Sequence, residues 1–195
     1  MKGQYSGEHF MKDKMTIRDY CYIGLFTSLI AIMAQISIPM PAGVPMTLQT
    51  FAVPLAGIVL GRKRGFLAAA VYVLLGAVGA PVFAGFTGGI GIILGATGGF
   101  IVSFPLMAYL AGLGMEKMSP VYLWGSLIIG AFLNYACGTV WFMAFSGSSL
   151  QTALMGCVVP FIPTSIVKII LDGTAGPLLR NVLSRAGLID SRSAS

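Results

Sequence analysis

Hydrophobic and polar positions along this chain are segregated into long apolar runs separated by short polar or Gly/Pro-rich segments. The first run covers about residues 20–38. At 1.5 Å per residue, a helix of this length reaches about 28 Å, which is enough to cross the hydrocarbon core of a bilayer. The preceding residues 1–19 are polar and are predicted to form an N-terminal tail. A secretory signal peptide is not favoured, because the first run lacks a convincing cleavage site and more apolar runs follow.

The next two runs are short and lie on either side of a basic triplet. Residues 47–60 contain Pro54, residues 65–78 follow, and Arg62-Lys63-Arg64 stand between them. Short or interrupted runs are compatible with spans that surround a site inside the protein. The alternative is a hairpin that dips into the bilayer without crossing it, and the charge pattern below favours crossing. The prolines of residues 39–45 predict an extended, uncharged loop before these runs.

Two longer runs follow, at about residues 90–113 and 121–145. Each is long enough for one span. Pro105 is a predicted kink within the first of them.

The last apolar run covers residues 150–183, which is longer than one span requires. Pro160 and Pro163 divide it. We therefore expect a short helix at the membrane surface over residues 150–159 and a sixth span that begins near Pro163, since proline is favoured in a first helical turn.

Charged residues fall only on alternate connections. The connections at about residues 39–46, 79–89 and 146–163 carry none. Because basic residues are enriched in cytoplasmic loops, the sequence predicts an all-α bundle of six transmembrane helices over residues 20–184, with both termini and the tail 185–195 in the cytoplasm. The charges assigned to the cytoplasmic side are Lys12, Lys14, Arg18, Arg62, Lys63, Arg64, Glu116, Lys117, Arg180, Arg185 and Arg192.

The composition supports a membrane protein and excludes several functions. Hydrophobic residues make up 56% and charged residues 9% of the chain, whereas soluble domains are about a quarter charged. The net charge of +6 lies in short clusters between apolar runs, so nucleic acid is not an expected partner. The three cysteines have no paired spacing, and the single histidine lies in the polar tail, so neither a disulfide framework nor a metal site is expected. No P-loop, dinucleotide, HExxH or nucleophile–base pattern occurs, so an enzyme is not expected.

Residues 79–100, GAPVFAGFTGGIGIILGATGGF, are glycine-rich and uncharged. Irregular backbone is tolerated at membrane depth only where it is buried or lines a cavity. This stretch therefore predicts a substrate site near the outer face. The alternative is that its glycines only permit close packing of helices.

Lys168 and Asp172 are charged residues within the last span, four positions apart and hence on one helix face. Such residues are costly in lipid and usually face a cavity or a partner. Lys168 lies near a helix N-terminus that would face outwards. Its cation adds to the positive end of the helix dipole there, and together these would suit an anionic group such as a carboxylate. An intrahelical ion pair, or Lys168 extending to the headgroups, is the structural alternative.

Other polar side chains in the runs are candidates for ligand contacts. Gln49 offers two donors and an acceptor, and Thr47 offers a hydroxyl. Helix capping by Thr47 and interhelical hydrogen bonding by Asn134 explain these residues equally well. The further candidates are Tyr72 and Tyr135, with Phe83 and Phe161 as pocket walls.

Three motifs in this order resemble the BioY family of biotin transporters. They are Ile38-Pro39-Met-Pro41 with Pro45-Met-Thr47-Leu-Gln49-Thr50, then Gly76 to Gly99 with its Pro81-Val82-Phe83, and Pro160-Phe161-Ile-Pro163 with Lys168. The resemblance covers roughly residues 20–180. One departure is that Thr164-Ser165 stand where the family carries an acid three residues before the lysine, and Asp172 is a candidate replacement.

The resemblance implies a substrate-binding S component of an energy-coupling factor (ECF) transporter, in a bacterial plasma membrane. Such proteins bind biotin near the outer face and join a transmembrane coupling protein and two ATPases, and some act alone. The small residues matching the family's surface for the coupling protein are Gly24 and Ser28.

We therefore expect a biotin-uptake S component without a cofactor. Lys168 is expected to meet the biotin carboxylate, and the polar candidates to meet the ureido ring. Gly85, Gly88, Gly89 and Gly99 are expected to let the backbone close over the ligand. An S component for another vitamin and a non-transporting membrane scaffold are the alternatives.

Overall fold

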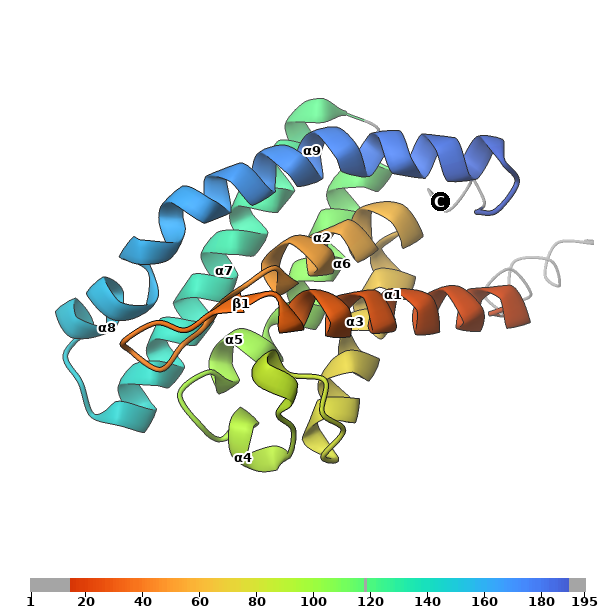
Figure 1. Cartoon of the computed structure of the whole chain (residues 1–195). Helices are drawn as coiled ribbons and strands as arrows, with labels where there is room; N and C mark the ends of the chain where they lie inside the picture. Colours follow the sequence, from red (N-terminus) through yellow and green to blue (C-terminus); the bar gives the residue numbers. More distant parts are fainter. Residues whose placement is uncertain (1–14, 118, 190–195) are drawn as a thin grey trace, which may run out of the picture.

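A computed structural model describes residues 15–117 and 119–189 of the chain, and these residues are mostly helical (Figure 1). The elements are α1 (Ile17–Gln35), β1 (Ser37–Ile38), β2 (Met46–Thr47), α2 (Gln49–Leu60), α3 (Arg62–Ala77), η1 (Ala84–Phe86), α4 (Ile90–Ile93), α5 (Gly98–Val102), α6 (Phe104–Glu116), α7 (Pro120–Ser146), α8 (Leu150–Cys157), η2 (Val159–Phe161) and α9 (Ile162–Arg185).

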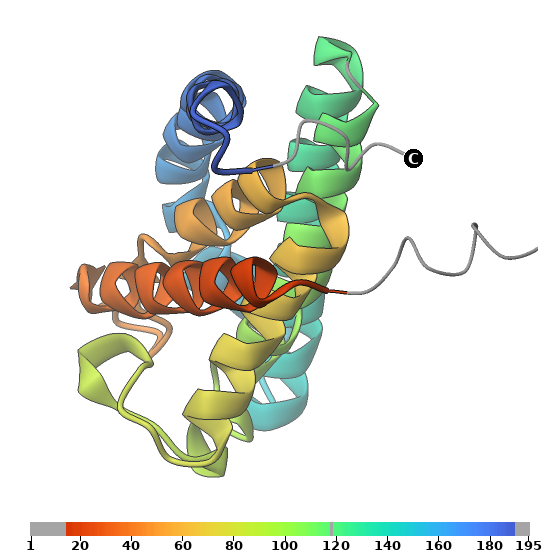
Figure 2. The ribbon, with the colours of Figure 1, turned by 90° about the vertical axis from the view of Figure 1, so that its right-hand side faces the viewer.

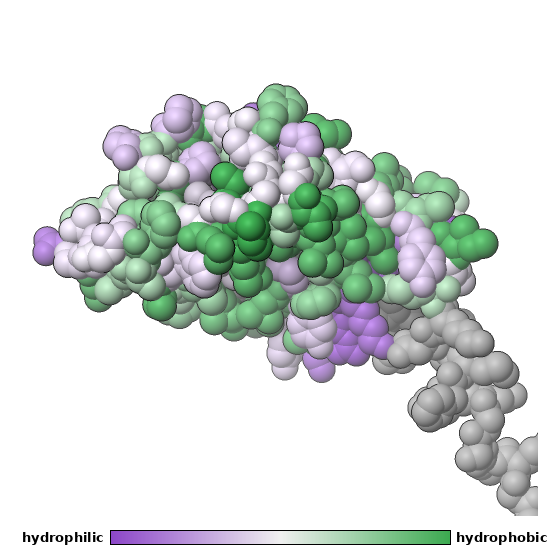
Figure 3. Space-filling view, turned by 90° about the horizontal axis from the view of Figure 1, so that it is seen from below, coloured by the Kyte–Doolittle hydropathy of each residue, from purple (hydrophilic) through white to green (hydrophobic). Residues whose placement is uncertain are grey.

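Four helical segments of the described chain are long and apolar enough to cross a membrane. They are Ile17–Gln35, Gly98–Glu116, Pro120–Ser146 and Leu150–Arg185, and α2 is a shorter apolar helix. The predicted positions of α2, α3, α7 and the short helix α8 agree with the structure to within about three residues. Large hydrophobic surfaces cover the face seen in Figure 3, as expected where helices meet lipid.

The first helix begins at Ile17, inside the segment predicted as tail. Thr16 Oγ1 accepts a hydrogen bond from Asp19 N, and Asp19 accepts one from Thr16 N, which forms a capping box. Asp19 is also buried against α3 by an ion pair with Arg64. Local capping of this kind extends the helix beyond its apolar run.

The span predicted over residues 90–113 is found only from residue 98 onwards, as the candidate span Gly98–Glu116. The chain forms the short helices α4 and α5 before α6, which is linked to α5 across Ser103. Gly95 lies in the turn between α4 and α5, and its carbonyl accepts a hydrogen bond from Trp141 Nε1 instead of continuing a helix. Pro105 lies in the first turn of α6, directly after the interruption at Ser103 that divides the segment Gly98–Glu116.

The predicted loop at residues 39–45 is the tip of a small antiparallel hairpin. Ser37 pairs with Thr47, and Ile38 pairs with Met46. The hairpin therefore carries the chain from α1 to α2 and places Thr47 in the interior of the protein.

Helix α2 is the centre of the fold, and nearly all its residues are buried. A Cβ at Gly57 would lie 2.0 Å from the carbonyl oxygen of Ala108, so α2 and α6 approach closely only because residue 57 is glycine. Helices α1, α3 and α9 pack on its other sides. The views in Figures 1 and 2 agree that α1 and α9 flank this centre.

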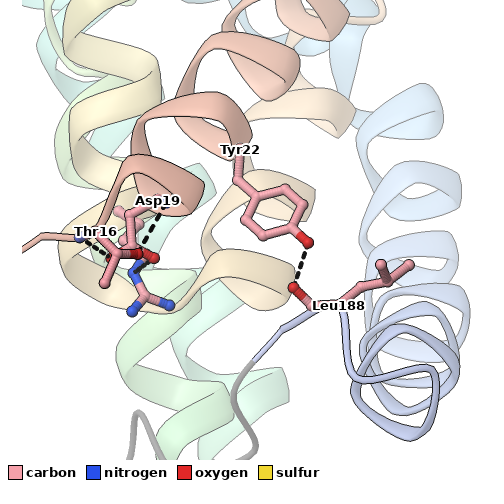
Figure 4. A network of polar contacts seen from close by, with 5 residues as sticks. Thr16, Asp19, Tyr22 and Leu188 are labelled. Atoms are coloured by element: carbon pink, nitrogen blue, oxygen red, sulfur yellow. Dashed lines mark hydrogen bonds and ion pairs between the residues drawn. The ribbon is translucent and has the colours of Figure 1, made fainter.

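The start of α1 and the end of α9 lie at the same end of the molecule (Figure 1). Here Arg62 pairs with Glu116 at 3.2 Å and Arg64 pairs with Asp19 at 3.0 Å. The Tyr22 hydroxyl donates to Leu188 O (Figure 4). We name this region the basic end. Lys12, Lys14 and Arg192 lie outside the described residues.

Candidate functional site

A cavity of about 330 Å³ is lined by the hairpin, the glycine-rich stretch, the start of α2, the middle of α7 and the first half of α9. The hairpin, α4 and α5 lie away from the basic end in Figure 1. The walls of the cavity are mainly apolar, with polar groups from four parts of the chain. Seven predicted site residues line it: Thr47, Gln49, Phe83, Asn134, Tyr135, Phe161 and Lys168. The structure therefore brings these residues, which are far apart along the chain, together around one cavity.

Lys168 is the charged residue among those that line the cavity. Its Nζ donates to Thr47 O at 2.6 Å and to Thr50 Oγ1 at 2.9 Å, and the residue is 8% exposed. An ammonium group has three donors. Two are used by these contacts, so one remains for an acceptor in the cavity. The hairpin strand β2 and the start of α2 thus hold the ammonium at the cavity wall.

A buried chain of hydrogen bonds continues from Thr47 across the cavity wall. Thr47 Oγ1 donates to Gln49 Oε1 at 2.8 Å, and Gln49 Nε2 donates to the Tyr72 hydroxyl. The Tyr72 hydroxyl in turn donates to Val82 O at 3.1 Å. Tyr72 is fully buried and does not line the cavity, so it supports the wall rather than facing a ligand.

Helix α7 contributes Asn134 and Tyr135. Asn134 Nδ2 donates to Phe100 O at 3.0 Å and to Ser103 Oγ at 2.7 Å, which uses both amide hydrogens to hold the turn between α5 and α6. Its carbonyl oxygen is therefore the group that it can offer to a ligand donor. The hydroxyl of Tyr135 is hydrogen-bonded to Ser165. Ser165 is the residue three positions before Lys168, where the resembling family carries an acid.

The aromatic wall is anchored by close packing. A Cβ at Gly76 would lie 2.0 Å from the ring of Phe83, so the glycine makes room for this side chain. Phe83 is 1% exposed and meets Tyr72 edge to face at 5.6 Å between ring centroids. Phe161, the last residue of η2, also lines the cavity.

The predicted glycines Gly85, Gly88, Gly89 and Gly99 do not line the cavity. Gly85 and Gly89 have φ values of 70° and 101°, which few other residues adopt, so they shape the turns around it. A Cβ at Gly88 would lie 2.2 Å from Ala80 O, and one at Gly99 would lie 2.4 Å from Trp141 Cβ. These glycines therefore serve turns and close packing, while the stretch as a whole still borders the site.

Asp172 also lies away from the cavity lining. It is one turn beyond Lys168 in α9 and 1% exposed, and its buried Oδ1 has no hydrogen-bond partner among the described residues. The structure therefore does not bring Asp172 to the cavity wall, where Lys168 lies.

Sequence reasoning missed several residues that line the cavity. Thr50, Thr87 and Thr97 add hydroxyl-bearing side chains, and Thr50 could have been found because it follows Gln49 in the same motif. The missed apolar and backbone contributors are Gly43, Val44, Pro45, Ala84, Gly91, Ile92, Gly95, Ala96, Phe100, Ile101 and Phe104. Most lie on the hairpin tip or in the glycine-rich stretch, whose course depends on tertiary contacts.

The two small residues proposed for partner binding lie on the outer face of α1. Gly24 and Ser28 are both exposed, and a Cβ at Gly24 would meet nothing within 4 Å. Ser28 Oγ donates back to Gly24 O at 2.9 Å, which leaves a shallow surface at these positions. Another helix can approach closely at such a surface.

The fold and the cavity define a membrane-embedded protein that binds a small solute. The volume and the mostly apolar lining with a few polar groups are typical of small-molecule sites. The described residues contain no group of three or more side chains able to hold a metal ion.

Comparisons with known proteins define the particular family. The sequence profile of the BioY family matches residues 11–185, and the chain belongs to this family. It is therefore a multi-pass membrane protein of a transporter family and not an enzyme.

Relatives of this chain include three named biotin transporters. The "Probable biotin transporter BioY" of Pyrococcus horikoshii is 45% identical over 154 residues, with 79% of this chain and 91% of the relative covered. The biotin transporter BioY of Thermotoga maritima is 41% identical, with 80% and 91% covered. That of Rhodobacter capsulatus is 37% identical, with 80% and 90% covered.

A solved structure also matches this fold. It is the crystal structure at 2.1 Å of the S component for biotin from an ECF-type ABC transporter, with a TM-score of 0.77 and 27% sequence identity. The match covers 86% of this chain and 95% of the solved chain.

Proposed function

We propose that this chain is the biotin-binding S component of a vitamin uptake system. Membership of the BioY family and the similarity to a biotin S component support this function. The observation that carries it is the cavity with Lys168 at its wall, because biotin combines a carboxylate, an apolar tail and a ureido ring. A mostly apolar cavity with one cation and separate amide and hydroxyl groups matches all three parts.

The contacts within the cavity divide into two kinds. Lys168 has one donor left for the carboxylate, and a hydrogen bond between charged groups is stronger than one between neutral groups. The proposed acceptor for a ureido N–H is the carbonyl oxygen of Asn134, because both hydrogens of its amide bond to Phe100 O and Ser103 Oγ. Phe83, Phe161 and Phe100 supply apolar surface for the rings and the aliphatic tail.

The proposed topology has six spans in the plasma membrane, with the cavity facing outwards and the basic end in the cytoplasm. The absence of charge in the loops around the cavity, together with the arginines of the basic end, supports this orientation. Gly24 and Ser28 form the proposed surface for the transmembrane coupling protein, which joins two ATPases. ATP is then hydrolysed by these partners and not by this chain.

Titration calorimetry of the detergent-purified protein tests the binding function. We expect saturable binding of biotin at one site per chain. A competition panel of other vitamins tests specificity, because Ser165 occupies the position of the family acid and bonds to Tyr135. No biotin isotherm would refute the function, and stronger binding of another vitamin would reassign the substrate. Co-purification from the native membrane tests for the coupling protein and the ATPases.

A further inference from the structure

The segment Val82–Thr87 forms one edge of the cavity, and it is held by residues distant in sequence. Phe83, Ala84 and Thr87 line the cavity. Phe83 N donates to Thr87 O at 2.9 Å, which closes the segment into a tight turn. The turn contains two consecutive residues with left-handed backbone, Gly85 with φ 70° and Phe86 with φ 55°.

Among the described residues, Phe86 is the single non-glycine residue with a positive φ. A bulky residue in this region is a conformational outlier that persists only when its surroundings fix it. Its side chain is 73% exposed, so packing of the ring does not supply the constraint. The backbone must therefore be held by other groups.

Gln35, the last residue of α1, supplies that constraint. Its Oε1 accepts from Phe86 N at 2.8 Å, and its Nε2 donates to Phe83 O at 3.1 Å and to Ala31 O of α1 at 3.0 Å, with Val82 O as a longer contact at 3.4 Å. One side-chain amide thus binds both ends of the turn. Val82 O also accepts from the Tyr72 hydroxyl, so the turn is connected to the hydrogen bonds that lead through Gln49 to Thr47 and Lys168.

We propose that Gln35 is a positioning residue that keeps the Val82–Thr87 turn folded over the cavity and thereby sets how long the ligand stays bound. Gln35 does not line the cavity, so it acts through Phe83, Ala84 and Thr87. Without its amide, the positive φ of Phe86 favours opening of the turn. Opening exposes the ligand to solvent and speeds its release. This inference rests on the proposed function, because it requires a ligand in the cavity.

The test is a chase experiment with labelled biotin on the purified full chain. Gln35→Met keeps the length of the side chain and removes its hydrogen bonds. We expect dissociation to become about tenfold faster, which corresponds to about 1.4 kcal/mol, with the association rate little changed. Gln151→Met is the matched control, because Gln151 is exposed on α8 and does not line the cavity. It should release biotin at the wild-type rate.

A second substitution separates positioning from a general loss of structure. Phe86→Asn places a residue that tolerates positive φ in the turn. Alone it should slow dissociation by about threefold, since the backbone outlier is relieved. Combined with Gln35→Met, it should return the dissociation rate towards that of the wild type. A purely structural defect at Gln35 would not be rescued in this way.

The outcomes are decisive in each case. An unchanged dissociation rate in Gln35→Met, an equal rise in Gln151→Met, or no rescue by Phe86→Asn would overturn the inference. If Gln35→Met does not yield folded protein, failure of Phe86→Asn alone to slow release overturns it. A wild-type chain that binds no biotin would refute the proposed function and this inference with it, whereas binding with unchanged release in Gln35→Met refutes only the role of Gln35.

Discussion

The cavity and the basic end use polar groups in different ways. At the basic end, Arg62 and Arg64 pair with Glu116 and Asp19, and Tyr22 bonds to a backbone carbonyl. At the cavity, Lys168 is held by Thr47 and Thr50 and keeps one donor for the open space. Arg62 and Arg64 are thus paired with carboxylates of the protein, whereas the contacts of Lys168 are with neutral oxygens.

This difference indicates how a ligand-binding charge can be told from a structural one in a protein without a catalytic motif. A charged residue in a span is costly unless it has partners. Where the partners are carboxylates, the residue has a structural role. Where they are neutral oxygens beside a cavity, the remaining charge favours an anion. Substitutions at the two ends should therefore separate loss of binding from loss of stability.

The largest effect is expected at Lys168. Lys168→Ala should weaken biotin binding by about 10- to 150-fold, as for loss of a hydrogen bond to a charged group worth about 1.5–3 kcal/mol. Calorimetry measures this change. Lys117→Ala at the exposed end of α6 removes the same charge away from the cavity and is the control. Equal effects of the two substitutions would contradict the role of Lys168.

A smaller effect, on both binding and stability, is expected for Tyr72→Phe. It leaves buried Gln49 Nε2 and Val82 O without the Tyr72 hydroxyl. Such loss costs about 1–3 kcal/mol of stability. Thermal unfolding should show a lower melting temperature, and biotin should bind more weakly because the wall is less ordered. Tyr122→Phe, at a residue 61% exposed, should behave as wild type. An unaltered melting temperature for Tyr72→Phe would disprove the supporting role.

At the basic end, Arg64→Ala should lower stability by about 1.5 kcal/mol without changing biotin affinity. It removes the ion pair with Asp19, which still accepts the capping bond from Thr16 N. Thermal unfolding and calorimetry on the same preparation measure the two quantities. Arg185→Ala, at an exposed residue, is the control. Weaker biotin binding by Arg64→Ala would show that the two ends are not separable.

The smallest effect is expected for Tyr22→Phe, which removes the contact with Leu188 O shown in Figure 4. The loss should be about 0.5–1 kcal/mol of stability, with no change in biotin affinity. Thermal unfolding checks it against Tyr20→Phe, since the Tyr20 side chain is 62% exposed. If Tyr22→Phe lost more stability than Tyr72→Phe, the hydrogen bond at the basic end would matter more for stability than the one behind the cavity wall, contrary to this ranking.

Much of the fold was predictable because long apolar runs and prolines mark helices. The ranges of α2, α7 and α8 follow from such signals. The hairpin was missed because Ser37–Thr47 pairing depends on contacts across the loop, and α1 was placed too late because capping by Thr16 and burial of Asp19 extend it. The break before α5 depends on the Trp141 bond to Gly95 O, which no local pattern reveals.

The candidate site was predictable at its polar residues and less so at its glycines. Lys168, Gln49 and Asn134 stood out because polar groups are rare in apolar runs, and all three line the cavity. Gly88 and Gly99 could not be distinguished from lining residues in the sequence. Glycine permits close approach, but the approaching group can be a ligand or another part of the chain. Gln35 was missed because its partners in the Val82–Thr87 turn lie about fifty residues away in sequence.

The most direct test of the central claim compares biotin with biotinamide, in which the carboxylate is replaced by a neutral amide, on the wild type and on Lys168→Ala. If the Lys168 ammonium binds the carboxylate in the cavity, the wild type should prefer biotin over biotinamide by about tenfold or more, and Lys168→Ala should lose this preference. Equal binding of the two ligands by the wild type, or a preference that persists in Lys168→Ala, would contradict the account.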